Sequence, residues 1–293
     1  MADNFADRLI GAIEKKTSPI CVGIDPIIAS MPDAVFRGGR DKADGGDPQA
    51  SIDAIFEFTT RVLKLVAPHV PCVKFQSAYF EQFHYEGVEA YFNLIQEAAE
   101  LGLLVIGDVK RGDIASTAAA YADAAFGPVW DADSLTINPY LGRDAVEPFL
   151  SAAKAAGRGV FVLVRTSNAG AGLFQDLVCD GKPLYRHVAA AVAEWNAATL
   201  GACGLGDVGA VVGATHPREL AELRAALPNV WFLVPGYGAQ GATAADVKAA
   251  YRADGLGAVV NSSRGVTFPF HPDDPAWESK VTAAARRAAA ELA

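Results

Sequence analysis

Cysteine is scarce in this sequence, and the few cysteines present form no recognisable pattern. The chain of 293 residues has four, Cys21, Cys72, Cys179 and Cys203, which lie far apart with no C-x-x-C pair among them. Structural zinc sites and the disulfide frameworks of small secreted domains both rely on closely spaced cysteines. The sequence therefore predicts neither kind of site, and it favours a cytoplasmic location.

Positive charge is also in short supply. Lysine and arginine total 25 against 34 aspartates and glutamates, which gives a formal net charge of -9. A protein that binds nucleic acid usually carries a basic face, so no nucleic acid partner is expected. A local basic pocket that holds a small anion remains compatible with this balance.

Long hydrophobic runs are missing as well. No apolar run approaches the roughly 18 residues that are needed to cross a bilayer. The amino-terminal stretch MADNFADRLI carries acidic side chains where a signal peptide would carry a basic region followed by an apolar one. Neither membrane insertion nor secretion is therefore expected.

What the sequence does contain is a series of short apolar runs rich in valine, isoleucine and leucine. They are continuous rather than alternating, which is typical of strands buried on both faces of a parallel sheet. Helix-length segments rich in alanine, leucine and glutamate separate them, such as residues 51–66 and 88–102. The eight runs are PICVGID (19–25), PCVKFQ (71–76), LLVIGDVK (103–110), DSLTINPY (133–140), GVFVLVRTS (159–167), GAVVGAT (209–215), VWFLVPGYG (230–238) and GAVVNSSRG (257–265).

Eight alternations of strand and helix predict an α/β protein with a single (β/α)8 TIM barrel over residues 1–293. No Ser/Pro-rich or highly charged linker divides the chain, which supports a single domain. In such a barrel the active site lies at the carboxyl ends of the strands. A doubly wound open sheet is the competing fold, because alternation alone does not establish closure.

Two irregular insertions, residues 31–50 and 168–183, follow the first and the fifth expected strands. Both are rich in glycine, aspartate and proline, which predicts loops. Each begins at the carboxyl end of its strand, on the side where barrel enzymes build their sites. Two interpretations stay open: the insertions fold over a ligand, or they are surface additions that the fold tolerates.

The segment DVKRGDIAST, residues 108–117, crowds charges directly after the third apolar run. Because side chains alternate faces along a strand, Asp108 and Lys110 are expected on the same face. Asp113 is expected to open the following helix, and Lys74 ends the neighbouring strand at the same rim of the barrel. We therefore expect these four charged side chains to converge.

This cluster has two possible meanings. A network of ion pairs that caps the barrel rim would perturb titration without any function. Position favours chemistry instead, because barrel enzymes place catalytic groups at the carboxyl ends of their strands. Burying four ionisable groups there also carries a desolvation cost that a purely structural rim avoids.

The last two expected strands are followed by segments that suit a phosphate. LVPGYGAQGAT (233–243) follows the seventh strand and NSSRG (261–265) the eighth, and in (β/α) barrels these two loops commonly form a phosphate site. The glycines let the backbone approach an anion, Gln240 can donate from its amide, and Arg264 can hold two oxygens. A phosphorylated small molecule is the expected ligand.

Polar side chains also follow the first and the fifth expected strands. Asp25 in VGIDP can accept hydrogen bonds from ribose hydroxyls, or it can cap a loop. Thr166, Ser167 and Asn168 are suited to reading the edge of a base or an amide, and they are equally compatible with a local turn or a helix cap. The residues alone leave both interpretations open.

DVKRGDIAST is similar to the D-x-K-x-x-D-I-x-x-T signature of the orotidine 5′-phosphate decarboxylase family. All five specified positions are present, as Asp108, Lys110, Asp113, Ile114 and Thr117. Other segments match those of the family in order along nearly the whole barrel: CVGIDP, VKFQ, VRTSNAGA, VPGYGAQG and NSSRG. The chain length and the two insertions resemble the longer bacterial subgroup.

The resemblance implies a reaction and a set of roles. The family converts orotidine 5′-monophosphate to uridine 5′-monophosphate and CO2 in pyrimidine biosynthesis, with neither metal nor organic cofactor and with Lys110 as the implied proton donor. It is a homodimer with sites shared across the interface, so Asp113, Ile114 and Thr117 would come from the partner subunit. The implied catalytic residues are Lys110, Asp108, Asp113 and Lys74, and the implied substrate-binding residues are Asp25, Ile114, Thr117, Ser167 (with Thr166 as the alternative), Gln240 and Arg264.

Two other functions stay open at this point. A related barrel family of sugar-phosphate decarboxylases and hexulose-phosphate synthases shares a D-x-K-x-x-D core but uses magnesium; the DIAST and RTSN segments favour the pyrimidine substrate. A non-catalytic nucleotide-binding protein is the other alternative. Intact Lys110, Asp108 and Asp113 argue against it, because a degenerate relative would lose its costly charges first.

Overall fold

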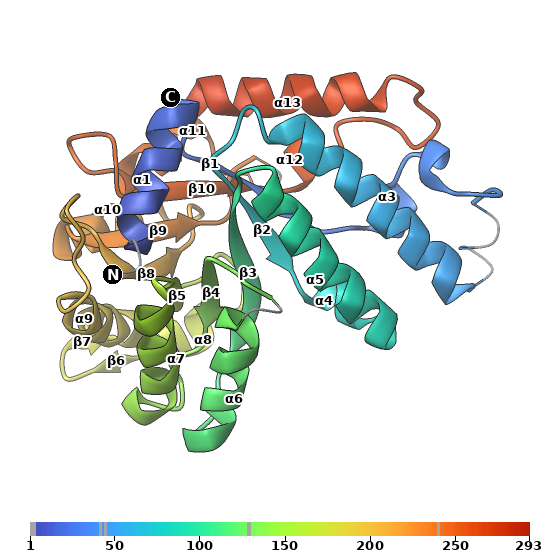
Figure 1. Ribbon diagram of the computed structural model, residues 1–293. Coiled ribbons are helices and arrows are strands. Elements are labelled where there is room, and N and C mark those ends of the chain that lie inside the picture. The colour runs from blue at the N-terminus through green and yellow to red at the C-terminus, as the bar shows by residue number, and fades with distance from the viewer. Residues whose placement is uncertain (1–3, 41–42, 44–45, 128–129, 239–240) are drawn as a thin grey trace.

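A closed barrel of eight parallel strands forms the centre of the molecule (Figure 1). The computed structural model describes residues 4–40, 43, 46–127, 130–238 and 241–293. The strands pair in the order β1-β10-β9-β8-β5-β4-β3-β2, so the expected (β/α)8 TIM barrel is confirmed and the open sheet is excluded. The barrel strands are β1 (Ile20–Ile24), β2 (Cys72–Gln76), β3 (Leu104–Arg111), β4 (Ser134–Ile137), β5 (Gly159–Arg165), β8 (Gly206–Val212), β9 (Val230–Val234) and β10 (Ala258–Ser262).

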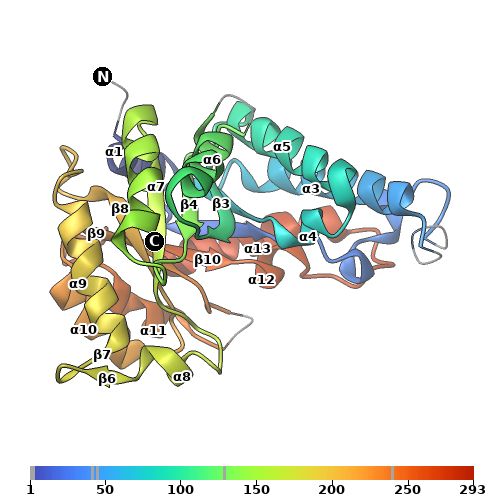
Figure 2. The same cartoon turned by 90° about the horizontal axis from the view of Figure 1, so that it is seen from below.

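Helices follow the strands and surround the barrel (Figures 1 and 2). The longer ones are α1 (Phe5–Lys16), α3 (Pro48–Val66), α5 (His84–Glu100), α6 (Ala115–Phe126), α7 (Arg143–Ala156), α9 (Leu184–Asn196), α10 (Pro217–Ala226) and α13 (Trp277–Leu292). The shorter ones are α4 (Ala78–Glu81), α8 (Gly172–Gln175), α11 (Ala244–Val247) and α12 (Arg264–Thr267), with 3₁₀ turns η1 (Ile28–Ser30), η2 (Asp33–Val35) and η3 (Lys248–Ala250).

Local signals explain where the helix after β1 begins. The Asp47 side chain accepts hydrogen bonds from the backbone N–H groups of Gln49 and Ala50, and Pro48 occupies the first helical position. Helix α3 therefore begins at Pro48 rather than at residue 51. The first insertion accordingly ends earlier than the sequence predicted.

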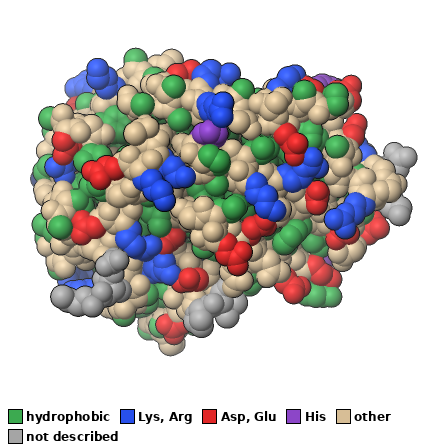
Figure 3. All heavy atoms as spheres, turned by 45° about the horizontal axis from the view of Figure 1, so that its top comes forward, with side chains coloured by type: hydrophobic (Ala, Val, Ile, Leu, Met, Phe, Trp, Pro, Cys, Tyr) green, Lys and Arg blue, Asp and Glu red, His purple; other side chains and the backbone are tan. Residues whose placement is uncertain are grey.

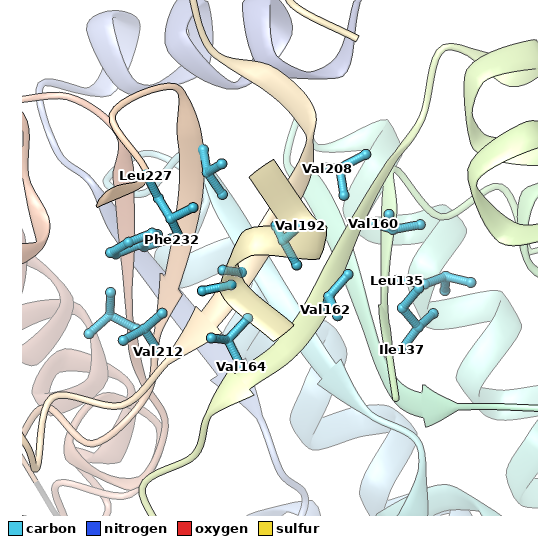
Figure 4. Close-up of a cluster of buried hydrophobic side chains, with 14 of the residues drawn as sticks. Leu135, Ile137, Val160, Val162, Val164, Val192, Val208, Val212, Leu227 and Phe232 are labelled. Carbon is cyan, nitrogen blue, oxygen red and sulfur yellow. The ribbon is translucent and has the colours of Figure 1, made fainter. Parts of the chain in front are cut away.

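The apolar core has two layers, one on each side of the barrel strands. Outside the barrel, aliphatic side chains of the strands pack against the surrounding helices, as Figure 4 shows for Val162 of β5 near Val192 of α9. Inside the barrel, Phe161 and Trp231 are fully buried. The strands are thus covered on both faces, which explains their continuous apolar sequences.

The amino-terminal end of the barrel is filled by α1. Phe5 packs edge-on against Phe161, with 6.1 Å between the ring centroids. Glycines make this possible: a Cβ at Gly159 would lie 2.3 Å from the Phe5 ring, and one at Gly209 would lie 2.5 Å from the Phe161 ring. Because side chains close this end, the carboxyl end of the barrel is left for a ligand.

The insertion at residues 168–183 contains regular structure where the sequence predicted a loop. It forms α8 and an antiparallel hairpin of β6 (Val178–Cys179) and β7 (Lys182–Pro183), which lie beside α9 (Figure 2). Asp180 and Gly181 have φ of 48° and 75° at the hairpin turn. An Asp-Gly pair is a strong hairpin signal, which the composition of the insertion concealed.

The surface that is visible in Figure 3 carries charges of both signs, as the composition of the sequence suggests. Figure 3 shows acidic and basic side chains interspersed on the face over which α13 runs, in the part that the structure describes. Among the described residues, no helix combines the length and apolar character that crossing a membrane requires.

Candidate active site

Three charged side chains meet at the carboxyl ends of β2 and β3. The Asp108 carboxylate accepts hydrogen bonds from Lys74 Nζ at 2.6 Å and from Lys110 Nζ at 2.5 Å. The Thr136 hydroxyl of β4 donates to the same carboxylate at 3.0 Å, and Gln76 Nε2 donates at 3.2 Å. Lys74 and Asp108 are buried, whereas 46% of the Lys110 side chain is exposed. One carboxylate is thus fixed by four donors, and one ammonium group stays accessible.

Strand β3 reaches this arrangement through an irregular backbone. Its register against β4 shifts between Gly107 and Arg111, and Lys110 has a φ of 46°, in the left-handed region that non-glycine residues avoid. The Lys110 N–H donates to Thr136 Oγ1 at 3.0 Å, which helps to hold this conformation. Asp108 and Lys110 therefore meet as predicted, but not through the simple alternation from which the prediction was made. Backbone strain of this kind is concentrated at functional sites.

The strain at Lys110 gives a testable expectation. Lys110→Gly and Lys110→Ala both remove the amine, so the difference between their free energies of unfolding reports the backbone strain at this position. We expect the glycine variant to be more stable by about 1 kcal/mol, because glycine adopts a positive φ without the steric cost that alanine carries. Urea unfolding of the two variants measures the difference. Equal stability, or a more stable alanine variant, would contradict a strained position.

Burial and charge oppose each other in this cluster. Burial alone would raise the pKa of Asp108, but the ammonium groups of Lys74 and Lys110 outweigh it and lower that pKa to about 2. Burial would likewise lower the pKa of Lys74, yet the carboxylates of Asp108 and Asp25 raise it above its ordinary value. Lys74 and Asp108 are therefore both ionised at neutral pH.

The lowered pKa of Asp108 predicts an acid-dependent loss of stability. The ordinary value of this carboxyl is 3.8 and the folded value is about 2, so its stabilising contribution is complete above pH 3.8 and disappears as the pH falls through 2. Asp108→Asn removes this titration while every other carboxyl is retained. We expect the stability advantage of the unmodified chain over the variant to shrink by about 2 kcal/mol between pH 5 and pH 2 in urea unfolding. Parallel pH profiles would contradict the assignment.

A cavity of about 560 Å³ adjoins the charged cluster. It has two buried side-chain oxygens without a hydrogen-bond partner among the described residues, Asp25 Oδ1 at the end of β1 and Asn261 Oδ1 in β10. Unpaired buried acceptors require donors, so they point to a ligand that carries hydrogen-bond donors. The residues around the cavity include Asp25, Lys74, Asp108, Lys110, Thr136, Thr166, Ser167, Asn168, Gln175, Asn261 and Ser263.

The end of β5 presents two hydroxyl groups to this cavity, and their surroundings differ. The Thr166 hydroxyl accepts from Gln175 Nε2 at 2.8 Å and donates to Asn168 Oδ1 at 2.7 Å, so its only proton is already committed. The Ser167 hydroxyl has no such partner within the described part of the chain. Of the two side chains that the sequence left open, Ser167 therefore has the hydroxyl that is free for a ligand.

A second cavity, of about 340 Å³, continues from the first and shares Asp25 and Asn261 with it. Arg264 lines this cavity, is exposed, and forms no ion pair with any described residue. The loop after β9 reaches it through Gly236, whose φ of 107° is a conformation that favours glycine. Gln240, which the sequence placed here, lies outside the described residues.

Asp113, Ile114 and Thr117 do not line either cavity of their own chain. Helix α6 begins at Ala115, so Asp113 precedes it rather than opening it, and the Asp113 carboxylate accepts from the N–H of Ile114 at 2.8 Å. Among the described residues, Asp113 forms no ion pair with Lys110, and 54% of Ile114 is exposed. Within one chain the expected cluster thus contains three of its four charged residues.

Several side chains in the site had no role predicted from the sequence, among them Gln76, Thr136 and Asn261. Thr136 and Asn261 are polar residues within fully buried strands, which is the signal that would have identified them. Within the described ranges, no group of three or more His, Cys, Asp or Glu side chains is arranged to hold a metal ion.

The chain matches known proteins over most of its length. The sequence profile of the orotidine 5′-phosphate decarboxylase / HUMPS family matches residues 18–274. Proteins named orotidine 5′-phosphate decarboxylase from Rhodopirellula baltica and Caldicellulosiruptor bescii are 45% identical over 293 residues (96% of each chain) and 40% identical over 280 residues (91% of this chain, 90% of the other). The solved structure of Leishmania donovani OMP decarboxylase has a TM-score of 0.76 and 34% identity, and the match covers 99% of this chain and 97% of that one. The family profile, the related sequences and the solved structure all match this chain over nearly its whole length. The chain therefore belongs to the orotidine 5′-phosphate decarboxylase / HUMPS family.

Proposed function

We propose that this chain converts orotidine 5′-monophosphate to uridine 5′-monophosphate and CO2, a carboxy-lyase reaction of pyrimidine biosynthesis. One observation supports this most directly: the accessible ammonium group of Lys110 is held against Asp108 at the rim of a cavity large enough for a nucleotide base and ribose. The names of the relatives support the same reaction.

The two cavities suit the parts of this nucleotide. The unpaired oxygens of Asp25 and Asn261 can accept from ribose hydroxyls, and Ser167 can hydrogen-bond to the amide edge of the pyrimidine. In the adjoining cavity the guanidinium of Arg264, which pairs with no described acidic residue, can bind two phosphate oxygens. We place Gln240 beside that phosphate by its sequence position alone.

Lys110 carries the chemistry in this proposal. The bond between C6 and the carboxylate carbon breaks, its electron pair stays on C6, and CO2 leaves. The Lys110 ammonium stabilises the developing carbanion and then transfers one of its protons to C6. No electron acceptor and no other reactant is needed, so the proposed step requires neither metal nor organic cofactor.

Asp108 has two functions in this step. It positions the Lys110 ammonium through the 2.5 Å contact, and it faces the carboxylate of the substrate. Two like charges about 4 Å apart repel by roughly 4 kcal/mol at an effective dielectric constant of about 20, and the repulsion is relieved as CO2 leaves. Lys74 keeps Asp108 ionised for this purpose.

We further propose a homodimer in which Asp113, Ile114 and Thr117 complete the site of the partner subunit. The exposure of Ile114 and the position of all three residues outside their own cavities support this arrangement. We also propose a single domain over residues 1–293 and no nucleic acid partner. A cytoplasmic location is proposed as well, and the four cysteines, which are free thiols, support it.

The proposed reaction is tested by following the ultraviolet absorbance of orotidine 5′-monophosphate with purified protein in the presence of EDTA. We expect turnover at an undiminished rate, with uridine 5′-monophosphate as the product. Turnover that depends on added magnesium, or activity on a sugar phosphate instead, would favour the metal-dependent branch of the family. Binding of the uridine nucleotide without turnover would favour a non-catalytic protein.

A further inference from the structure

The insertion after β5 reaches back to the end of that strand through one side chain. Gln175, the last residue of α8, accepts at Oε1 from the Thr166 N–H at 3.0 Å and donates from Nε2 to the Thr166 hydroxyl at 2.8 Å. The Thr166 hydroxyl in turn donates to Asn168 Oδ1 at 2.7 Å. One amide group thus holds both the backbone and the side chain of a residue at the rim of the larger cavity, which Gln175 also lines.

Helix α8 has a second attachment to β5 through Arg165, which also donates from Nη1 to Gln175 Oε1 at 3.4 Å. Arg165, which is 3% exposed, forms an ion pair with Asp176 at 3.1 Å and lies over the Tyr185 ring, 5.5 Å from its centroid. Gly172 leaves room for this pair, because a Cβ there would lie 2.6 Å from the Asp176 carboxylate. Removal of the Gln175 amide therefore leaves the helix anchored.

Ser167 connects this arrangement to the ligand. It packs closely over β8, since a Cβ at Gly213 would lie 2.8 Å from the Ser167 Cβ. Its backbone is joined to Thr166, and its hydroxyl is free among the described residues. The Thr166 hydroxyl is engaged with Gln175 and Asn168. Of the two hydroxyl groups, that of Ser167 can therefore hydrogen-bond to a base.

We propose that Gln175 is a positioning residue that fixes the segment 166–168 and thereby sets the affinity for the pyrimidine part of the nucleotide. The inference rests on the proposed function, since that function assigns the end of β5 to the base. Without the Gln175 amide, the Thr166 N–H loses its acceptor, the Thr166 hydroxyl loses one donor, and the segment 166–168 is no longer fixed against α8. The insertion is then part of the specificity of the site rather than a neutral addition to the surface.

Gln175→Met tests this role, because methionine has a similar length and lacks both polar atoms. Calorimetry would compare uridine 5′-monophosphate, which has the base, with ribose 5-phosphate, which lacks it. We expect uridine 5′-monophosphate to bind about 30-fold more weakly, because the base must then order the segment 166–168 that Gln175 otherwise holds in place. Ribose 5-phosphate should bind as it does to the unmodified chain. KM for orotidine 5′-monophosphate should rise more than kcat falls.

Two further variants separate positioning from general disruption. Gln175→Glu keeps the acceptor for the Thr166 N–H, and its carboxylate can accept from the Thr166 hydroxyl while Asn168 turns its amide to donate. We therefore expect its affinity for uridine 5′-monophosphate within about threefold of the unmodified chain. Phe174→Ser alters an exposed side chain of the same helix and should leave the affinity for both ligands unchanged.

Equal weakening of both ligands by Gln175→Met would overturn the proposal and indicate a structural role. A similar loss in Phe174→Ser, or no loss in Gln175→Met, would overturn it as well. If the unmodified chain neither binds uridine 5′-monophosphate nor turns over orotidine 5′-monophosphate, the proposed function itself fails and this inference fails with it. That outcome is distinguishable because it appears before any substitution is made.

Discussion

An alanine at position 110 is expected to reduce kcat for orotidine 5′-monophosphate by on the order of 10⁵-fold. The substitution removes a general acid, which typically contributes about 10² to 10⁴, together with a preorganised charge aimed at the carbanion, which contributes about 10² to 10³. Both contributions come from the Lys110 ammonium group, which the cluster holds beside Asp108. The loss should appear in kcat more than in KM, because the carbanion exists only near the transition state.

Absorbance assays at saturating substrate would measure the loss, and calorimetry with uridine 5′-monophosphate would test whether the variant still binds. We expect binding of the product to be largely retained, since the product has no carboxylate to interact with Lys110. A variant that turns over within tenfold of the unmodified chain would contradict the role of Lys110. A variant that loses all affinity for the product would indicate a damaged site rather than a missing proton donor.

Lys110→Arg separates the two contributions. Arginine keeps a positive charge near Asp108, but its guanidinium does not lose a proton at any pH of the assay. We therefore expect this variant to stay far below the unmodified chain, with at most a partial gain over Lys110→Ala. Activity close to normal in Lys110→Arg would mean that charge alone is sufficient and that the proton comes from elsewhere.

The barrel and the centre of its site were predictable from the sequence for identifiable reasons. Strands covered on both faces have continuous apolar sequences, and the inner layer around Phe161 and Trp231 explains that pattern. Parallel strands in a barrel also end at a common rim, so Lys74 and Asp108 were expected to meet from their positions alone. At these residues the apolar pattern of each strand and the topology of the barrel lead to the same prediction.

Other features depend on contacts that a linear pattern does not contain. The positive φ of Lys110 arises from the register shift between β3 and β4 and is supported by Thr136, a residue remote in sequence. The unpaired oxygen of Asn261 is recognisable only once β1 and β10 lie side by side. The contact of Gln175 with Thr166 needs the fold of an insertion whose composition indicated a loop. In each case a contact between residues that are remote in sequence determines the local structure.

A mixture of two inactive variants is expected to recover activity if sites are shared between subunits. Lys110→Ala removes the proton donor from its own cavity, whereas Asp113→Ala removes a group that we assign to the partner's site. In a hybrid dimer one site then combines the intact Lys110 of one chain with the intact Asp113 of the other. Random pairing makes half of the dimers hybrid with one complete site of two, so we expect about a quarter of normal activity per chain after joint refolding.

The matched control pairs Lys110→Ala with Asp108→Asn. These two residues contact each other at 2.5 Å within one chain, so every site in the hybrid lacks one of them and no activity should return. Recovery in the first mixture but not in the second requires Asp113 to act across the interface. If neither mixture recovers, although successive purification on two different affinity tags shows that hybrids have formed, Asp113 acts within its own chain. The segment 111–114 would then have to turn toward its own cavity, from the outward position that it has in the single chain.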